Sequence, residues 1–371
     1  MYLKERIIGL IVFYSLLFLM TFFVSKSNNY KSIKKILIAY VLLLSIMAYF
    51  YLPNDSADLS RHFISLKLYS NMSTSDFINA ISINSAPGAL LYFRIIGKLN
   101  NIHLLPCITS FIYYGILFTL YFYFIKNYKI NSKSAAFSLF LFMICGRFLG
   151  IISGIRNGLA FILIFCAIYR EFFLDKKIIS NVFLYLIAIL IHPAALIIIF
   201  LRFLFILFEK NSLGFRIVNL IFLMIMGFVF YKYNYYILDE AINKSNLYLS
   251  ETTYFYIWEH IISLIYIVFY IITIFIFNKK IKDKRITNLG NFIMIINVFC
   301  FIFIYEHSIF TRIQNFSSLL FLFYYMFVLN QLHINDKKMK VYSFLTYVIM
   351  FSILIISLTR GNISSLKFFI N

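Results

Sequence analysis

The sequence predicts an all-α fold, namely a polytopic integral membrane protein with about twelve transmembrane helices. Residues of the hydrophobic class occupy 62% of the 371 positions. Apolar runs without a charged residue recur along the chain, and a run of about 18 residues is long enough to cross the hydrocarbon layer as one helix. Lys and Arg accumulate in alternate connections between these runs, which is the pattern that the positive-inside rule produces.

The expected crossings follow the apolar runs in chain order. The first, "IIGLIVFYSLLFLMTFFV" (7–24), is predicted to be a retained helix because it does not end in the small residues of a cleavable signal. The others are expected at about 36–52, 103–125, 135–150, 155–170, 178–191, 194–208, 217–231, 257–277, 288–305, 313–330 and 341–358. No long repeat and no soluble stretch interrupts them, so residues 1–371 are expected to form a single transmembrane domain.

Segment 178–208 is predicted to form two short helices. As one helix it would reach about 46 Å, which is too long, whereas two pieces divided at His192-Pro193 would reach about 21 to 24 Å each. Such pieces fall short of the roughly 30 Å hydrocarbon layer, but they can work if the turn lies inside the protein. The division also keeps the loop "KKIKDKR" (279–285) on the same side as the other basic loops. We therefore expect short paired helices around an active cavity.

The formal net charge of +20 is mostly a topology signal. The basic connections are predicted to be cytoplasmic, and they lie at 26–35, 126–133, 170–177, 279–285 and 337–340. A nucleic acid partner is not expected, because it would require basic residues on one face of a soluble element. The four cysteines are scattered singly, so neither a metal site nor a disulfide is predicted, and no cofactor is implied.

The external loops then fall at about 53–102, 232–256 and 306–312. Within the first, residues 75–100 are predicted to form an amphipathic helix on the lipid surface, interrupted near Pro87-Gly88.

Ionisable side chains outside the basic loops converge on the predicted external face. Such residues are costly at membrane depth and usually face a partner or a water-filled cavity. The candidates are Arg147 and Arg156 around one turn, His192 at another, and Glu306, His307 and Arg312 in "EHSIFTR". For His192 two roles are predicted: a part in substrate binding or reaction, or a hydrogen bond to the carbonyl of Ile189, which Pro193 leaves without a donor.

The segment "CGRFLGIISGIRNGLA" (145–160) is predicted to contain a helix break. Arg147 and Arg156 are nine residues apart, so one continuous helix would place them on opposite faces. The glycines at positions 146, 150, 154 and 158 can supply the break, because glycine tolerates conformations closed to other residues. Alternatively, these glycines form a small-xxx-small packing face between helices. For the arginines, contact with a ligand is the favoured interpretation.

The first external loop, "PNDSADLSRHF", carries a second candidate cluster. A helical turn would place Asp55, Asp58 and His62 on one face, where they would bind sugar hydroxyls or accept a proton. The alternative is a helix-entry segment after Pro53, with a capping side chain from Asn54 or Asp55.

Four motifs occur in order: the acidic loop "PNDSADLSRHF", "RNGLA" (156–160) at the start of a helix, "AILIHPAAL" (188–196) and "TRIQNF" (311–316). Over roughly residues 50–330, this arrangement resembles the EpsG/Wzy family of bacterial membrane polysaccharide polymerases. The loop departs from that family's commoner Asp-aromatic-x-x-Tyr form, because Asp58 is followed by Leu59 and only Phe63 supplies an aromatic ring.

The resemblance implies a metal-independent membrane glycosyltransferase of the bacterial inner membrane, with its active site facing the periplasm or exterior. It would join oligosaccharide repeat units carried on undecaprenyl pyrophosphate into an O-antigen or capsule chain. Its partners would be the lipid-linked glycan, as donor and acceptor, and membrane lipid. Candidate protein partners are a chain-length regulator and a flippase of the same pathway.

For this reaction the base is expected to be Asp58 before Asp55, with His192 as the alternative. The pyrophosphate would bind guanidinium groups, which offer bidentate hydrogen bonds and permanent charge. The candidates for that role are Arg156, Arg147 and Arg312. Further substrate-binding candidates are Arg61, His62, Glu306 and His307.

Two other classes of protein share part of this pattern. An O-antigen ligase, or another membrane glycosyltransferase that uses a lipid carrier, would show the same arginine-plus-acid arrangement on the external face. A polysaccharide flippase or transporter would be expected to carry repeated halves and polar residues through the membrane midplane. The polar bias here is one-sided, so the transporter is the less favoured alternative.

Overall fold

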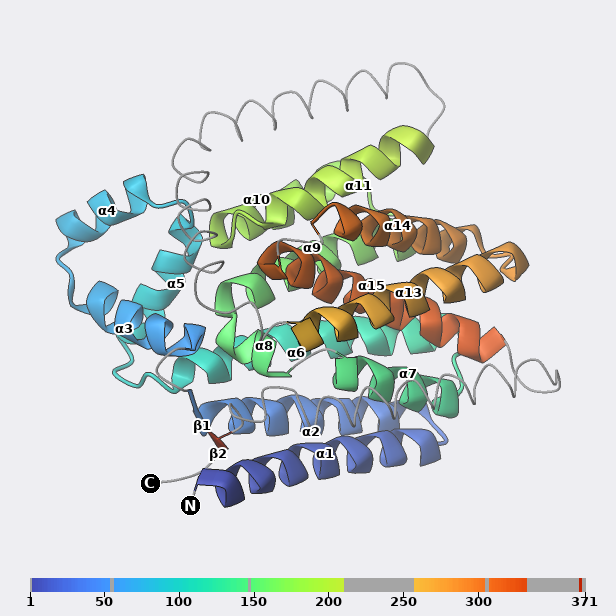
Figure 1. Cartoon of the computed structure of the whole chain (residues 1–371), viewed down its shortest axis with the longest axis horizontal. Helices are drawn as coiled ribbons and strands as arrows, with labels where there is room; N and C mark the ends of the chain where they lie inside the picture. Colours follow the sequence, from blue (N-terminus) through green and yellow to red (C-terminus); the bar gives the residue numbers. More distant parts are fainter. Residues whose placement is uncertain are drawn as a thin grey trace. The chain divides into compact units, whose positions relative to one another are not determined.

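The computed structural model describes residues 2–53, 57–145, 148–209, 257–303, 307–331 and 367–368, and it is mostly helical (Figure 1). The chain divides into two compact units. The first consists of Met1–Pro193 and Ser318–Asn371, and the second of Ala194–Ser317. Helix α15 (His307–Gln331) contributes its residues up to Ser317 to the second unit and its remainder to the first.

Long apolar helices pack in pairs in the first unit. Helix α1 (Tyr2–Lys26) packs against α7 (Ser132–Cys145), and α2 (Tyr30–Tyr49) packs extensively against α6 (Leu104–Asn127). The Asn29 side chain starts α2 by accepting a hydrogen bond from the Ser32 amide at 2.7 Å. Such a cap supplies one of the backbone partners that a helix end lacks.

The connection between α2 and α6 folds into three short helices. They are α3 (Asp58–Asn71), α4 (Thr74–Ile83) and α5 (Pro87–Gly97), with α3 packed on α5. The predicted interruption near Pro87-Gly88 is confirmed, because Pro87 opens α5 at a position where a missing amide hydrogen has no cost. Before α3, strand β1 (Tyr51–Leu52) pairs antiparallel with β2 (Lys367–Phe368), a pairing that the all-α prediction did not include.

The rest of the first unit begins with the short α8 (Phe148–Ser153), followed by α9 (Ile155–Phe173). A 3-10 turn, η1 (Ile178–Asn181), then leads into α10 (Val182–Ile191), which packs on α9. Partly buried polar contacts join these helices, since Asn181 and Tyr185 donate to the same carboxylate oxygen of Glu171, at 3.2 and 2.7 Å.

The described part of the second unit contains α11 (Ala195–Glu209), α13 (Ile257–Phe277), η2 (Asn278–Lys280), α14 (Lys284–Cys300) and η3 (Phe301–Phe303). Asp283 caps α14 by accepting from the amides of Arg285 and Ile286. Inside this unit the Ser317 hydroxyl donates to the Asn297 carboxamide oxygen at 2.9 Å.

The helices confirm one predicted boundary and differ from others. The break at His192-Pro193 is confirmed, because α10 ends at Ile191 and α11 begins at Ala195. The expected crossing at 135–150 was wrong in its end, since α7 stops at Cys145 and α8 is a separate helix. The expected helices at 288–305 and 313–330 begin earlier, at Lys284 and His307.

Among the described residues, four helices are long and apolar enough to cross a membrane: Tyr30–Tyr49, Leu104–Asn127, Ser263–Lys280 and Ile309–Gln331. Shorter apolar helices accompany them. The expected segments 217–231 and 341–358 lie outside the described residues, and the total of twelve crossings stays a prediction.

Candidate functional site

The candidate site is built on the elbow between α8 and α9. The predicted break is confirmed: α8 ends at Ser153, α9 begins at Ile155, and Gly154 lies between them with φ −84° and ψ 52°. A Cβ atom on Gly154 would stand 2.6 Å from the carbonyl oxygen of Gly150, so the elbow can be this tight only with glycine at that position. Arg156 is thereby placed in the first turn of α9.

The alternative role of these glycines as a packing face between helices stays a prediction. A Cβ on Gly158 would meet Ile151 of α8 at 3.4 Å, which is ordinary contact. The Gly158 amide also donates to the carbonyl of Gly154 at 2.9 Å. Gly146 lies outside the described residues.

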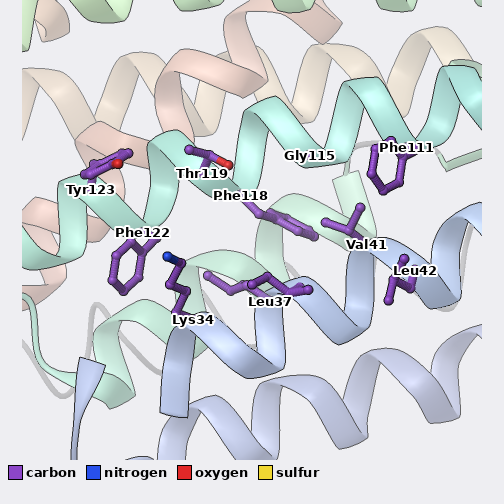
Figure 2. Close-up of a pocket in the computed structure, with 11 residues that line it drawn as sticks. Lys34, Leu37, Val41, Leu42, Phe111, Gly115, Phe118, Thr119, Phe122 and Tyr123 are labelled. Carbon is purple, nitrogen blue, oxygen red and sulfur yellow. The ribbon is translucent and has the colours of Figure 1, made fainter. Parts of the chain in front are cut away.

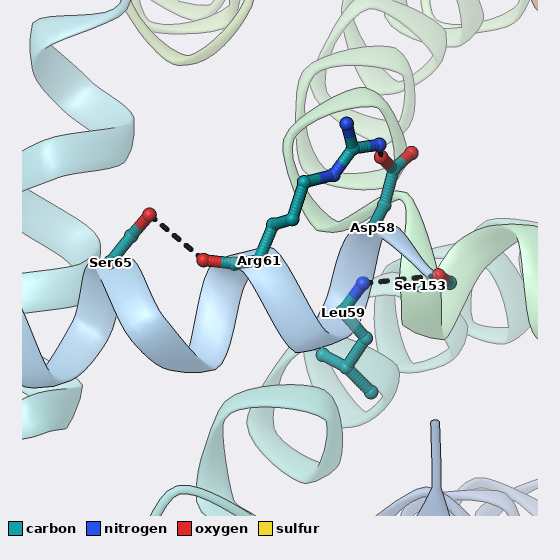
Figure 3. Close-up of polar contacts among 5 residues, drawn as sticks. All are labelled: Asp58, Leu59, Arg61, Ser65 and Ser153. Carbon is teal, nitrogen blue, oxygen red and sulfur yellow. Dashed lines mark hydrogen bonds and ion pairs between the residues drawn. The ribbon is translucent and has the colours of Figure 1, made fainter. Parts of the chain in front are cut away.

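Helix α3 is joined to this elbow by a cap from a distant residue. Its N-cap, Ala57, has no side-chain oxygen, and the amide of Leu59 donates instead to the Ser153 hydroxyl at 3.3 Å (Figure 3). The expected capping residues Asn54 and Asp55 lie outside the described residues, and the helix itself begins at Asp58. Ser153 therefore supplies the capping oxygen that α3 would usually receive from its own N-cap residue. It fixes the N-terminal end of α3, which carries Asp58, beside α8.

His62 is the buried member of the cluster. Its side chain is only 9% exposed, and its ring lies 5.1 Å from the ring of Phe93 on α5, centre to centre. Burial and the positive charge of Arg156 lower the pKa of His62 to about 4, against the opposing influence of Asp58, with Arg61 also lowering it. His62 is therefore neutral at pH 7, and α3 and α9 bring these four side chains within electrostatic range of one another.

Asp58 and Arg61 form an ion pair one turn apart on α3 (Figure 3). The Asp58 and Arg61 side chains are 52% and 60% exposed. Because exposed ion pairs contribute about 0 to 1 kcal/mol, a substrate can displace Arg61 from the carboxylate at little cost. The Asp58 carboxylate is thus accessible, whereas His62, one turn further along, is not.

Asn157 follows Arg156 in the first turn of α9, and the sequence prediction missed it. Its side-chain oxygen is buried and accepts no hydrogen bond from the residues that the structure describes. A buried carbonyl oxygen without a donor is uncommon in proteins, so this atom marks a place where a ligand hydroxyl could donate. The signal was present in the sequence, because Asn157 is the second residue of "RNGLA".

The other predicted site residues belong to other elements or lie outside the described residues. His192 is half-buried and caps α10 in an extended conformation, φ −153° and ψ 122°. The end of α10 lies against the first turn of α5, since a Cβ on Gly88 would stand 3.1 Å from the Leu190 carbonyl. The hydrogen bond expected between His192 and the Ile189 carbonyl stays a prediction.

Arg312 is half-buried on the part of α15 that belongs to the second unit. His307 opens α15, although its side chain is not described. Asp55, Arg147 and Glu306 lie outside the described residues, so their predicted roles are untested. Within the described ranges, no three His, Cys, Asp or Glu side chains gather as ligands for a metal ion would.

A model of the EpsG family matches residues 67–369, which is most of the chain. The predicted resemblance is thereby confirmed, although it begins at residue 67 and not near residue 50. The matched region contains Ser153, Arg156 and His192, whereas Asp58 and His62 precede it. No curated protein and no solved structure matches the chain.

Proposed function

Because the chain belongs to the EpsG family of Wzy-like polysaccharide polymerases, we propose that it joins oligosaccharide repeat units carried on undecaprenyl pyrophosphate. Membership itself indicates a membrane protein with polysaccharide polymerase-like, glycosyltransferase activity. The observation that carries the finer proposal is the convergence of Arg156, from the matched region, on Asp58 and His62 of the first loop.

In this proposal Arg156 binds the pyrophosphate of the donor. A guanidinium offers two parallel hydrogen bonds to phosphate oxygens, and its charge does not titrate. Its place in the first turn of a 19-residue helix adds to this, because amide groups and the helix dipole favour anions there. Gly154 has no side chain with which to cap these amides, so they suit a phosphate oxygen.

Asp58 takes the proton from the acceptor hydroxyl. The deprotonated oxygen attacks the anomeric carbon of the donor sugar, the bond from that carbon to the pyrophosphate breaks, and the pyrophosphate leaves with the electron pair. Arg156 stabilises the charge that develops on the leaving group. Arg61 pairs with Asp58 until substrate displaces it, and the neutral His62 of the same helix is buried against Phe93 of α5. His192 is the alternative base.

The proposed location is the bacterial inner membrane, with this chemistry facing the periplasm or exterior. Its support is the alternation of Lys and Arg along the chain, which assigns the connection from α2 to α6 to the side opposite the basic loops. Arg147 and Arg312 are proposed as further ligands of the pyrophosphate, and Glu306 and His307 as further substrate-binding residues, from the sequence alone. A chain-length regulator and a flippase of the same pathway are the proposed protein partners.

The test is polymerisation in vitro with purified lipid-linked repeat units. Asp58→Asn removes the proton acceptor while keeping shape, so we expect the rate to fall about 10²- to 10⁴-fold. The comparison set at matched protein levels is Asp55→Asn, His192→Ala and a control, Asp76→Asn. Asp76 is an exposed carboxylate on α4 that bonds locally to Ser73, so its replacement should leave the rate unchanged. Normal chain lengths from both Asp55→Asn and Asp58→Asn, with an inert His192→Ala, would move the base to His192.

Deleting the gene in its native strain separates the rival functions. Glycan capped with a single repeat unit indicates a polymerase, and carrier-linked polymer that never reaches its final acceptor indicates a ligase. A missing side-branch sugar indicates another transferase. Repeat units trapped inside the cell indicate a flippase.

A further inference from the structure

A groove runs between α2 and α6 in the first unit, on a part of the molecule that the proposed reaction does not use (Figure 2). It has a volume of about 280 Å³. Its floor is formed by the buried side chains of Leu37, Val41 and Phe118. Gly115 keeps it open, because a Cβ atom there would meet no other atom within 4 Å.

The groove is apolar along most of its length and cationic at one end. There the Lys34 ammonium lies 5.9 Å from the centre of the Phe122 ring (Figure 2). Lys31 and Lys35 are exposed on the same end of α2, and Lys126 lies in the last turn of α6, four residues beyond Phe122. Positive charge therefore gathers where the groove ends, and apolar side chains line the rest.

The length of the groove matches one leaflet of a bilayer. Along α6 it extends from Phe111 to Tyr123, which is about 18 Å at about 1.5 Å per residue. The hydrocarbon layer is roughly 30 Å thick, so one leaflet supplies about half of that. A lipid whose phosphate lies at Lys34 would have its acyl chain alongside the whole groove.

We propose that this groove binds one anionic phospholipid of the bilayer, with an acyl chain on Leu37, Val41 and Phe118 and the phosphate at Lys34. Basic side chains beside an apolar groove between membrane helices favour anionic head groups, each Lys strengthening binding by about fivefold. The site is separate from the reaction centre. Lys34 and Tyr49 are about 22 Å apart along α2, and Asp58 follows the Tyr49 end. In the proposed orientation the bound lipid belongs to the cytoplasmic leaflet.

The test is native mass spectrometry of the full-length protein with added phosphatidylglycerol or phosphatidylcholine. We expect the unmodified protein to retain one phosphatidylglycerol with at least about fivefold preference over phosphatidylcholine. Lys34→Gln should weaken phosphatidylglycerol binding by about fivefold. Gly115→Leu should fill the groove and abolish binding of the retained lipid. The matched controls are Lys98→Gln and Val182→Leu, which change exposed residues outside the groove and should bind as the unmodified protein does.

The proposal would be overturned if the unmodified protein retained the two lipids equally and Lys34→Gln left that retention unchanged. Unchanged phosphatidylglycerol binding in Gly115→Leu would also overturn it, as would a protein dimer that Gly115→Leu dissolves, because the groove would then be a contact between copies. Lys34→Gln leaves the shape of the groove intact, so it decides the matter even where Gly115→Leu lowers expression. The readout is bound lipid, so the result does not depend on whether the chain polymerises sugars.

Discussion

Replacing Gly97 by Ala should lower the rate of polymerisation, although Gly97 takes no part in the proposed reaction. Gly97 is the last residue of α5, where α5 meets α3. A Cβ there would stand 2.7 Å from the Ser70 Cβ and 2.8 Å from the Leu66 carbonyl oxygen. Because the oxygen belongs to the backbone, rotating a side chain cannot relieve that contact, and the two helices must separate.

The size and direction of that movement follow from the same contacts. Ordinary contact begins at 3.4 Å, so the helices must separate by about 0.7 Å. His62, Leu66 and Ser70 follow one another at intervals of four residues, on one face of α3. His62 meets Phe93, which is four residues before Gly97, so the separation acts directly on the candidate site. Overpacking of this kind costs about 1 to 3 kcal/mol, and a misplacement near 1 Å can lower a rate about 10²-fold.

The assay compares Gly97→Ala with Gly115→Ala, measuring polymerisation of lipid-linked repeat units at matched protein levels and thermal unfolding. At Gly115 a methyl group meets nothing, and alanine favours a helix by about 0.8 to 1.0 kcal/mol over glycine. We therefore expect Gly115→Ala to be active and at least as stable. A normal rate in Gly97→Ala despite a lowered melting temperature would refute the idea that the position of α3 controls the reaction. A normal rate with normal melting would refute the packing argument itself.

Three further predictions concern charge and topology. Arg156→Lys should impair polymer formation nearly as much as Arg156→Ala, because an ammonium keeps the charge but loses the two-pronged contact, and full activity in the Lys variant would contradict this. The pKa of His62 is about 4 when folded and about 6.5 when unfolded, so only the unfolded chain gains a proton as pH falls through 6.5. Stability should therefore drop by about 2 kcal/mol between pH 8 and pH 5, and melting curves of His62→Gln should lack this loss; an equal loss in that variant would rule His62 out as its source. Reporter fusions at positions 65, 245 and 309 should give an external signal, and fusions at 130, 282 and 337 a cytoplasmic one. A cytoplasmic signal at 309 with an external one at 282 would show that segment 178–208 crosses the membrane once.

Features governed by local backbone chemistry were predictable from the sequence. The interruptions at Pro87, Gly154 and Pro193 all occur where expected, because proline removes a backbone donor and glycine permits a contact that a Cβ would block. Apolar runs likewise located most of the described long helices. Their ends were less predictable, as α14 shows: it begins at Lys284 and not at 288, since Asp283 caps it within a polar stretch that lies outside the apolar run.

Contacts between distant segments were not predictable in the same way. The Ser153 hydroxyl that caps α3 is 94 residues from Leu59, and nothing in "GIISGIRNG" identifies that partner. Arg202 is not among the residues predicted from the sequence, although a lone arginine in an apolar run is a recognisable signal. It is 6% exposed on α11, with its guanidinium 5.5 Å from the Phe205 ring and 5.6 Å from the Phe292 ring. Aromatic faces attract such a cation, which contributes to its stabilisation inside the second unit.

The charge state of His62 links the parts of the candidate site. With its pKa lowered to about 4, His62 carries no proton to donate at neutral pH, and it is only 9% exposed, whereas the Asp58 side chain is 52% exposed. Among the clustered side chains, the accessible carboxylate of Asp58 therefore fits best the role of the proposed base. With His62 neutral, Arg61 and Arg156 exceed the single carboxylate by one positive charge. That excess suits an anionic pyrophosphate, and the burial of His62 keeps the same charge balance throughout the neutral pH range.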